Sequence, residues 1–217
     1  MGSQIADIIM HHQGLKKREA HRKAINLLEM VGIGEAGTRI HQYPHQLSGG
    51  MKQRIAVARA LACEPALLFA DEPTTNLDVT IQAQVLELIK ELKRRLNMSL
   101  VMITHDMGII AEMTDRVTVL YAGYVCESAG TTALFKTPKH PYTEALLRAV
   151  PRIDRTGKLN VIPGNIPNLI EPPSGCRFHP RCLYAADMCK HEVPQLEEAS
   201  ADHMVACNRW EELTLQS

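Results

Sequence analysis

The chain has 217 residues and balanced charge, with 24 Lys and Arg against 24 Asp and Glu. Balanced charge argues against a dedicated nucleic-acid-binding protein, and an aromatic content of 4% argues against stacking platforms for single strands. No apolar run approaches the roughly 20 residues that span a bilayer, and the N-terminus lacks the apolar stretch of a signal peptide. Composition therefore predicts a soluble, cytoplasmic protein that can bury a substantial core.

Residues 1–62 are expected to be mostly helical. Apolar residues recur at helical spacing from Ala20 to Val31, and Gly32-Ile33-Gly34 would end that helix. Gly32, Gly34 and Gly37 also have the spacing of a dinucleotide fingerprint, but that motif follows a strand. Because a helix precedes them here, we interpret these glycines as a helix end followed by a turn.

Residues 63–130 alternate short apolar runs with a helical pattern. The runs 66–70, 100–103 and 117–121 are predicted to be strands buried on both faces. A helix with one apolar face lies between the first two runs, and that face comprises Ile81, Val85, Leu88, Leu92 and Leu96. Strand, helix and strand in this order predict an α/β fold with a parallel sheet and a right-handed crossover.

Residues 131–217 contain nine of the twelve prolines and four of the six cysteines. One helix is predicted at about 142–149, and the rest is expected to be irregular. In a chain without a secretion signal, clustered cysteines indicate metal ligands more than disulfides. Their spacing is looser than zinc usually requires, and four reduced thiols in a small core remain an alternative. These cysteines are Cys176, Cys182, Cys189 and Cys207.

A Ser-Gly-Gly sequence precedes the expected helix at 54–62. Ser48 can cap that helix, while Gly49 and Gly50 would let a phosphate approach the N–H groups at its positive end. Taken alone, however, these three residues favour a simple capped turn.

Charged residues follow two of the expected strands. Asp71 and Glu72 end the first strand, and His105 follows the next, so all three are expected at one edge of the sheet, where open α/β sheets bind ligands. An Asp there can hold Mg²⁺, a Glu can take a proton from water, and a His can contact phosphate. The alternatives are a solvated acidic turn and a structural histidine.

Taken together, these motifs resemble those of the ABC-transporter ATPases. Residues 47–53 (LSGGMKQ) are similar to the signature motif, 67–72 to the Walker B strand, 76–78 to the D-loop and His105 to the switch histidine. The order and the spacing match throughout.

Three further stretches resemble the oligopeptide, dipeptide and nickel import branch of that family. They are 43–51, 140–143 and 172–182. The similarity covers essentially the whole chain, and Asn76, where Ala is commoner in the branch, is a small departure.

The resemblance implies a P-loop NTPase-like core with an irregular extension. Residues 1–62 would form part of the helical subdomain, 63–130 the ATPase core and 131–217 a peptide-transporter-type C-terminal region. The cofactors would be ATP and Mg²⁺, and a [4Fe–4S] cluster, or zinc, on the four cysteines.

The resemblance also implies roles for individual residues. Glu72 would be the general base, Asp71 the Mg²⁺ anchor and His105 the sensor of the γ-phosphate. The other expected nucleotide-binding residues are Ser48, Gly49, Gly50, Gln53 and Asp78. The expected partners are a second ATPase subunit in a head-to-tail dimer, membrane permease subunits and, indirectly, an extracytoplasmic binding protein, with the chain on the cytoplasmic face of the membrane.

The Walker A phosphate loop, Gly-x-x-x-x-Gly-Lys-[Ser/Thr], is absent from the sequence. The chain therefore resembles the C-terminal two-thirds of a subunit, and we expect it to be inactive alone and to complete one ATP site with a full partner. The alternative is a truncated, non-catalytic module that binds a partner or a metal. Whether the transported substrate is a dipeptide, an oligopeptide or nickel stays open.

Overall fold

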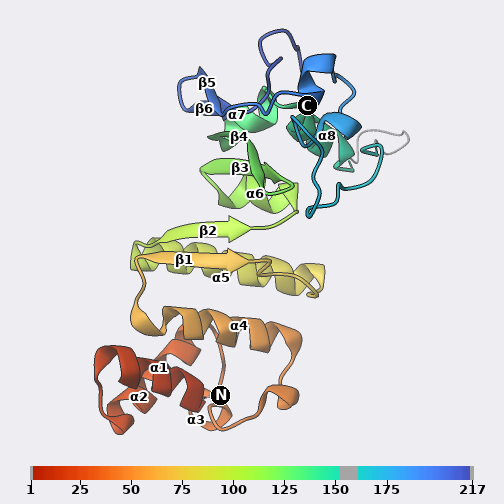
Figure 1. The fold of residues 1–217 in the computed structure, drawn as a ribbon. Helices are drawn as coiled ribbons and strands as arrows, with labels where there is room; N and C mark the ends of the chain where they lie inside the picture. The colour runs from red at the N-terminus through yellow and green to blue at the C-terminus, as the bar shows by residue number, and fades with distance from the viewer. Residues whose placement is uncertain (1, 152–160, 216–217) are drawn as a thin grey trace. The chain divides into compact units, whose positions relative to one another are not determined.

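The computed structural model describes residues 2–151 and 161–215 (Figure 1). It comprises two compact units, an N-terminal unit (Met1–His105) and a C-terminal unit (Asp106–Ser217). Among the described residues, no helix has both the length and the apolarity needed to cross a membrane.

Helices dominate the first part of the N-terminal unit, as predicted. They are α1 (Gly2–Gln13), α2 (Lys17–Met30), α3 (Ala36–Arg39), η1 (Pro44–Gln46), α4 (Gly49–Ala60) and η2 (Leu61–Cys63). Gly32 follows the end of α2 with φ +76°, a left-handed conformation that favours glycine, and its N–H donates to the carbonyl of Glu29 at 2.9 Å. The prediction of a helix end at these glycines is therefore confirmed.

A strand, a helix and a second strand follow, namely β1 (Leu67–Asp71), α5 (Val79–Leu96) and β2 (Ser99–Ile103). The two strands are parallel, with a register from Leu67 opposite Ser99 to Asp71 opposite Ile103 (Figure 1). This confirms the expected α/β pattern and parallel pairing. The face of α5 that packs inward includes Val85, Ile89 and Leu92.

The prediction that these strands are buried on both faces is wrong. In β1, Leu68 is buried while Phe69 is 66% exposed, and in β2 Ile103 is 52% exposed. Within the part of the chain that the structure describes, one face of the two-stranded sheet is covered and the other is exposed. An unbroken apolar run cannot distinguish one covered face from two, because the run contains no polar residue that would mark a solvent face.

The C-terminal unit contains an antiparallel sheet of four strands in the order β3-β4-β6-β5. The strands are β3 (Arg116–Tyr121), β4 (Tyr124–Gly130), β5 (Glu197–Ser200) and β6 (His203–Val205). The third predicted strand is β3, and it pairs with β4 rather than with β2. It too has one exposed face, because Leu120 alternates with buried Val119 and Tyr121.

Short helices complete this unit. They are α6 (Met107–Met113), α7 (Thr131–Lys136), α8 (Pro141–Ala149), η3 (His179–Arg181) and η4 (Asp187–Lys190). The helix predicted at about 142–149 is α8 and is confirmed. Its N-cap is His140, whose Nδ1 accepts a hydrogen bond from the N–H of Tyr142 at 2.9 Å.

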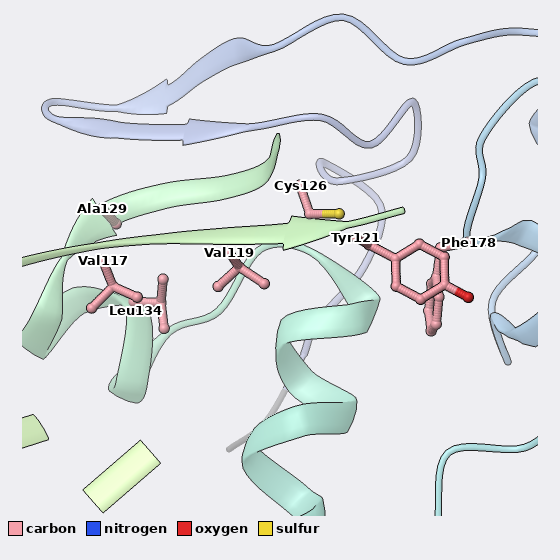
Figure 2. Packing of buried hydrophobic residues seen from close by; sticks show 7 residues of the cluster. All are labelled: Val117, Val119, Tyr121, Cys126, Ala129, Leu134 and Phe178. Atoms are coloured by element: carbon pink, nitrogen blue, oxygen red, sulfur yellow. The ribbon is translucent and has the colours of Figure 1, made fainter. Parts of the chain in front are cut away.

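The core of the C-terminal unit joins the sheet to the cysteine-containing segment. Figure 2 shows Phe178 beside Tyr121, and the two ring centroids are 5.1 Å apart in an edge-to-face arrangement. Cys126, from β4, belongs to the same buried cluster. Aromatic packing thus holds an irregular, proline-rich segment against regular structure.

Candidate nucleotide site

Glu72 and His105 meet at one edge of the two-stranded sheet. The N–H of Glu72 donates to the carbonyl of Ile103 at 2.9 Å, which extends the β1–β2 pairing by one residue. Nδ1 of His105 lies 2.7 Å from Oε1 of Glu72. The structure therefore brings together the two residues that the sequence placed at this edge.

The turn after β1 supplies a second contact to the same carboxylate. Glu72 has φ +45°, and the N–H of Thr75 donates to its carbonyl at 3.2 Å, which closes a turn through Pro73. The Thr75 hydroxyl donates to Oε2 of Glu72 at 2.8 Å. Sequence reasoning missed Thr75; the only available signal was its position, three residues after Glu72 across a proline-containing turn.

These contacts set the charge of Glu72. The hydrogen bond from His105, and next that from Thr75, lower the pKa of the carboxyl below its ordinary value because both stabilise the ionised form. Glu72 is therefore a carboxylate at neutral pH and can accept a proton. Asp71, the last residue of β1, is exposed beside it and could hold a hydrated Mg²⁺.

Ser48 caps α4, as expected from the sequence. Its Oγ accepts a hydrogen bond from the N–H of Met51 at 3.3 Å. Gly49 and Gly50 begin α4, and the first turn of a helix leaves backbone N–H groups without intrahelical partners, which suits an anion. Gln53 lies one turn further along the same helix.

The first turns of α4 and α5 pack against each other. A β-carbon at Gly50 would lie 2.7 Å from Cγ2 of Ile81, and one at Gly49 would lie 3.5 Å from Cδ2 of Leu77. Asp78 caps α5, its Oδ1 accepting from the N–H of Ile81 at 3.0 Å. The Ser48 turn and the Asp78 turn are thus neighbours, and Gly50 has a packing role besides any contact with phosphate.

In the C-terminal unit, the four clustered cysteines line one cavity: Cys176, Cys182, Cys189 and Cys207. Burial is the main cause that raises the pKa of Cys182 and Cys207 to about 11 each. Within residues 2–151 and 161–215, however, no group of three or more His, Cys, Asp or Glu side chains could hold a single metal ion. The structure brings the four thiols around a common space without forming a single-ion site.

Comparisons with known proteins match both units. The family model described as "ABC transporter" matches residues 3–75, and that described as "Oligopeptide/dipeptide transporter, C-terminal region" matches residues 126–189. The oligopeptide transport ATP-binding protein AppD of Bacillus subtilis is 49% identical over 213 residues, 98% of this chain and 65% of that protein. Both units of the chain are therefore similar to proteins of the ABC transporter family.

Other relatives of this chain have similar names. A putative peptide import ATP-binding protein of Brucella melitensis is 47% identical over 98% of this chain and 65% of its own length. The dipeptide transport ATP-binding protein DppD of Escherichia coli is 47% identical over 96% and 64%. The chain thus spans slightly less than two-thirds of these relatives. A solved dimeric ATP-binding cassette bound to ADP and Pi aligns with 54% of this chain and 49% of its own chain, at 32% identity and a TM-score of 0.47.

The family matches contain only part of the candidate sites. The "ABC transporter" match contains the Ser48 turn, Asp71 and Glu72, whereas Asp78 and His105 lie beyond residue 75. The C-terminal match contains three of the four clustered cysteines, and Cys207 lies outside it. The pairing of His105 with Glu72, and of Cys207 with the other cysteines, therefore comes from the three-dimensional structure.

Proposed function

We propose that this protein belongs to the ABC transporter family and is the ATP-binding and ATP-hydrolysing subunit of a peptide importer. The observation that carries the proposal is the hydrogen bond between Glu72 and His105 at the edge of a parallel sheet, in the same unit as the Ser48-capped helix. The names of the relatives, which transport or import peptides, support the substrate class.

Each residue at this edge has a chemical task in the proposal. Glu72 accepts a proton from the attacking water, Asp71 holds Mg²⁺ and His105 contacts the γ-phosphate. Ser48, Gly49 and Gly50 offer the N-terminus of α4 to the ATP of a second subunit, and this is where an anion is stabilised by the helix dipole. Gln53 and Asp78 flank that nucleotide.

The proposed assembly is a head-to-tail pair of ATPase subunits on membrane permeases at the cytoplasmic face, supplied by an extracytoplasmic binding protein. No Gly-x-x-x-x-Gly-Lys-[Ser/Thr] sequence occurs in the 217 residues. Backbone N–H groups and a lysine of that loop normally cradle the phosphates. These 217 residues by themselves would therefore complete the site of a partner that has its own phosphate loop, whereas the site beside Glu72 would need a phosphate loop from outside them.

Phosphate release from Mg²⁺–ATP tests this proposal. We expect no turnover by the isolated chain, and turnover when a full-length ATPase subunit is added. Gly49→Asp, which puts a negative charge where phosphate would bind, should abolish that turnover, while Glu72→Gln in this chain should not change it. Turnover by the isolated chain that Glu72→Gln abolishes would overturn the one-site account.

In a subunit that carries both the loop and these residues, the glutamate matters directly. There, Glu72→Gln should reduce turnover by roughly 10²–10⁴-fold, the range for loss of a general base. A smaller loss of turnover would show that Glu72 is not the general base. The alternative function, a non-catalytic module, is favoured only if no partner subunit yields turnover with this chain.

We further propose that the four-cysteine cavity binds a [4Fe–4S] cluster. In such a cluster each thiolate binds a different iron, so the cysteines must surround a space, as these do. Zinc needs four donors around one point, and the described residues offer no such group. The cluster would cross-link the irregular segment to Cys207 after β6, a structural use that suits a region with little regular structure.

A further inference from the structure

The two oxygens of the Glu72 carboxylate are held by donors of different origin. His105 contacts Oε1 at 2.7 Å, and the Thr75 hydroxyl donates to Oε2 at 2.8 Å. Hydrogen bonds to an ionised carboxylate are among the stronger ones in proteins. Each oxygen therefore has its own donor.

The two donors differ in how firmly they are tied to Glu72. Thr75 belongs to the same turn, and its N–H donates to the carbonyl of Glu72, so its hydroxyl moves together with the glutamate. His105 comes from the end of the neighbouring strand, and its side chain is 84% exposed. Its imidazole can turn toward a ligand without displacing packed neighbours.

We propose that Thr75 is a positioning residue, which keeps the Glu72 carboxylate in place through Oε2 when His105 turns away from Oε1. Oε1 is then the oxygen that reacts. In a subunit whose phosphate loop holds ATP beside Glu72, the oxygen of a water molecule bonds to the γ-phosphorus, and one proton of that water passes to Oε1. The bond from the γ-phosphorus to the bridging oxygen breaks, and its electrons leave with ADP.

The catalytic consequence rests on the proposed function, but the anchoring role does not. A backbone hydrogen bond from His105 also acts on this carboxylate, but more weakly than the two side chains. A carboxylate that lost both side-chain donors would sample several rotamers, and small displacements of a reacting group cost rate steeply. Thr75 thus keeps the Glu72 side chain in one rotamer while His105 contacts the ligand instead of Oε1.

The test removes His105 and then changes Thr75. Three-bond NMR couplings of the Glu72 side chain, in the whole chain carrying labelled glutamate, report whether its rotamer is fixed. We expect a fixed rotamer in His105→Ala, because Thr75 still holds Oε2. His105→Ala with Thr75→Val, which keeps the shape of the side chain without its hydroxyl, should lose the fixed rotamer. His105→Ala with Thr75→Ser should restore it.

A fixed rotamer in the His105→Ala, Thr75→Val protein would overturn the proposal, as would averaging in His105→Ala alone. Thr80→Val, in α5, controls for loss of a threonine hydroxyl elsewhere. None of these readings needs ATP hydrolysis. A chain that proves inactive with every partner would overturn the proposed function and leave the Thr75 result interpretable.

Discussion

Gly50 in α4 packs directly on Ile81 in α5, so closely that an added β-carbon would lie 2.7 Å from Cγ2 of Ile81. The γ2 methyl of isoleucine is attached to Cβ and cannot swing aside within a helix without a change of rotamer. The glycine therefore sets how closely the Ser48 turn approaches the Asp78 turn.

Gly50→Ala should reduce the free energy of unfolding by about 1–3 kcal/mol, the usual cost of overpacking. This loss should appear although alanine favours helix over glycine by about 1 kcal/mol. Gly49→Ala is the matched control, because its β-carbon would meet Leu77 at an ordinary contact distance of 3.5 Å. Urea unfolding followed by circular dichroism measures both.

A double-mutant cycle shows whether packing against Ile81 causes the loss of stability in Gly50→Ala. With Ile81→Ala in place, Gly50→Ala should no longer destabilise, because the clashing methyl is gone. An unchanged cost in that background would show that the contact with Ile81 is not the reason for glycine at this position.

Burial of His140 makes the stability of the C-terminal unit depend on pH. Desolvation lowers the pKa of this imidazole from 6.5 to about 4, against a smaller opposing effect of a hydrogen bond with the Ala206 backbone. Between these values the unfolded chain binds more protons than the folded one. Stability is therefore full above pH 6.5 and falls as the pH drops toward 4, by up to about 3 kcal/mol.

His140→Asn should flatten that dependence, because asparagine can still cap α8 at the N–H of Tyr142 but does not titrate in this range. Fluorescence of Trp210, the single tryptophan of the chain, reports unfolding of this unit in urea at pH 4.5 and pH 7. If the free energy of unfolding fell by the same amount between pH 7 and pH 4.5 in both proteins, the pH dependence would belong to groups other than His140.

The buried carboxylate of Glu127 accepts hydrogen bonds from three donors in the C-terminal unit. Its Oε1 accepts from the N–H of Lys139 and from Nε2 of His203, both at 2.7 Å, and its Oε2 accepts from the N–H of His140 at 3.0 Å. Glu127→Gln keeps the size but turns an amide N–H₂ toward one of these donors. We expect a loss of about 3 kcal/mol.

An exposed ion pair in the same unit provides the comparison. Asp187 contacts Nζ of Lys190 at 3.0 Å on the surface. Asp187→Ala should change the free energy of unfolding by less than about 1 kcal/mol. Unfolding monitored by Trp210 fluorescence measures both changes in free energy. Equal losses in Glu127→Gln and Asp187→Ala would contradict the claim that the buried carboxylate stabilises the unit more than the exposed one.

Iron content tests the cysteine cavity. After anaerobic purification, Cys189→Ser and Cys207→Ser should each lower the bound iron and sulfide, whereas Cys63→Ser should not, because Cys63 is exposed and lies in the N-terminal unit. Removal of the metal should lower the thermal midpoint of the C-terminal unit. A colourless protein that contains zinc in place of iron would reverse the assignment.

Local signals in the sequence predicted much of this structure. Gly32 follows the end of α2, Ser48 caps α4, Asp71 ends β1, and α8 begins at Pro141. Such features depend on neighbours in the chain, and so they are readable without a structure.

Features that depend on partners distant in sequence were not predictable. The apolar run of β3 has the same character as that of β1, and nothing in it indicates antiparallel pairing with β4. Exposure of Phe69 depends on what covers the sheet rather than on the strand itself. The Thr75 contact required the turn conformation at Glu72, since a hydroxyl three residues away can point in several directions.

The number of ATP molecules retained per dimer of this chain and a full-length partner subunit tests the central claim most directly. After removal of free nucleotide, the account predicts one ATP, held between the partner's phosphate loop and the Ser48 turn of this chain. No retained ATP would contradict the nucleotide role of that turn, and two would contradict a single competent site.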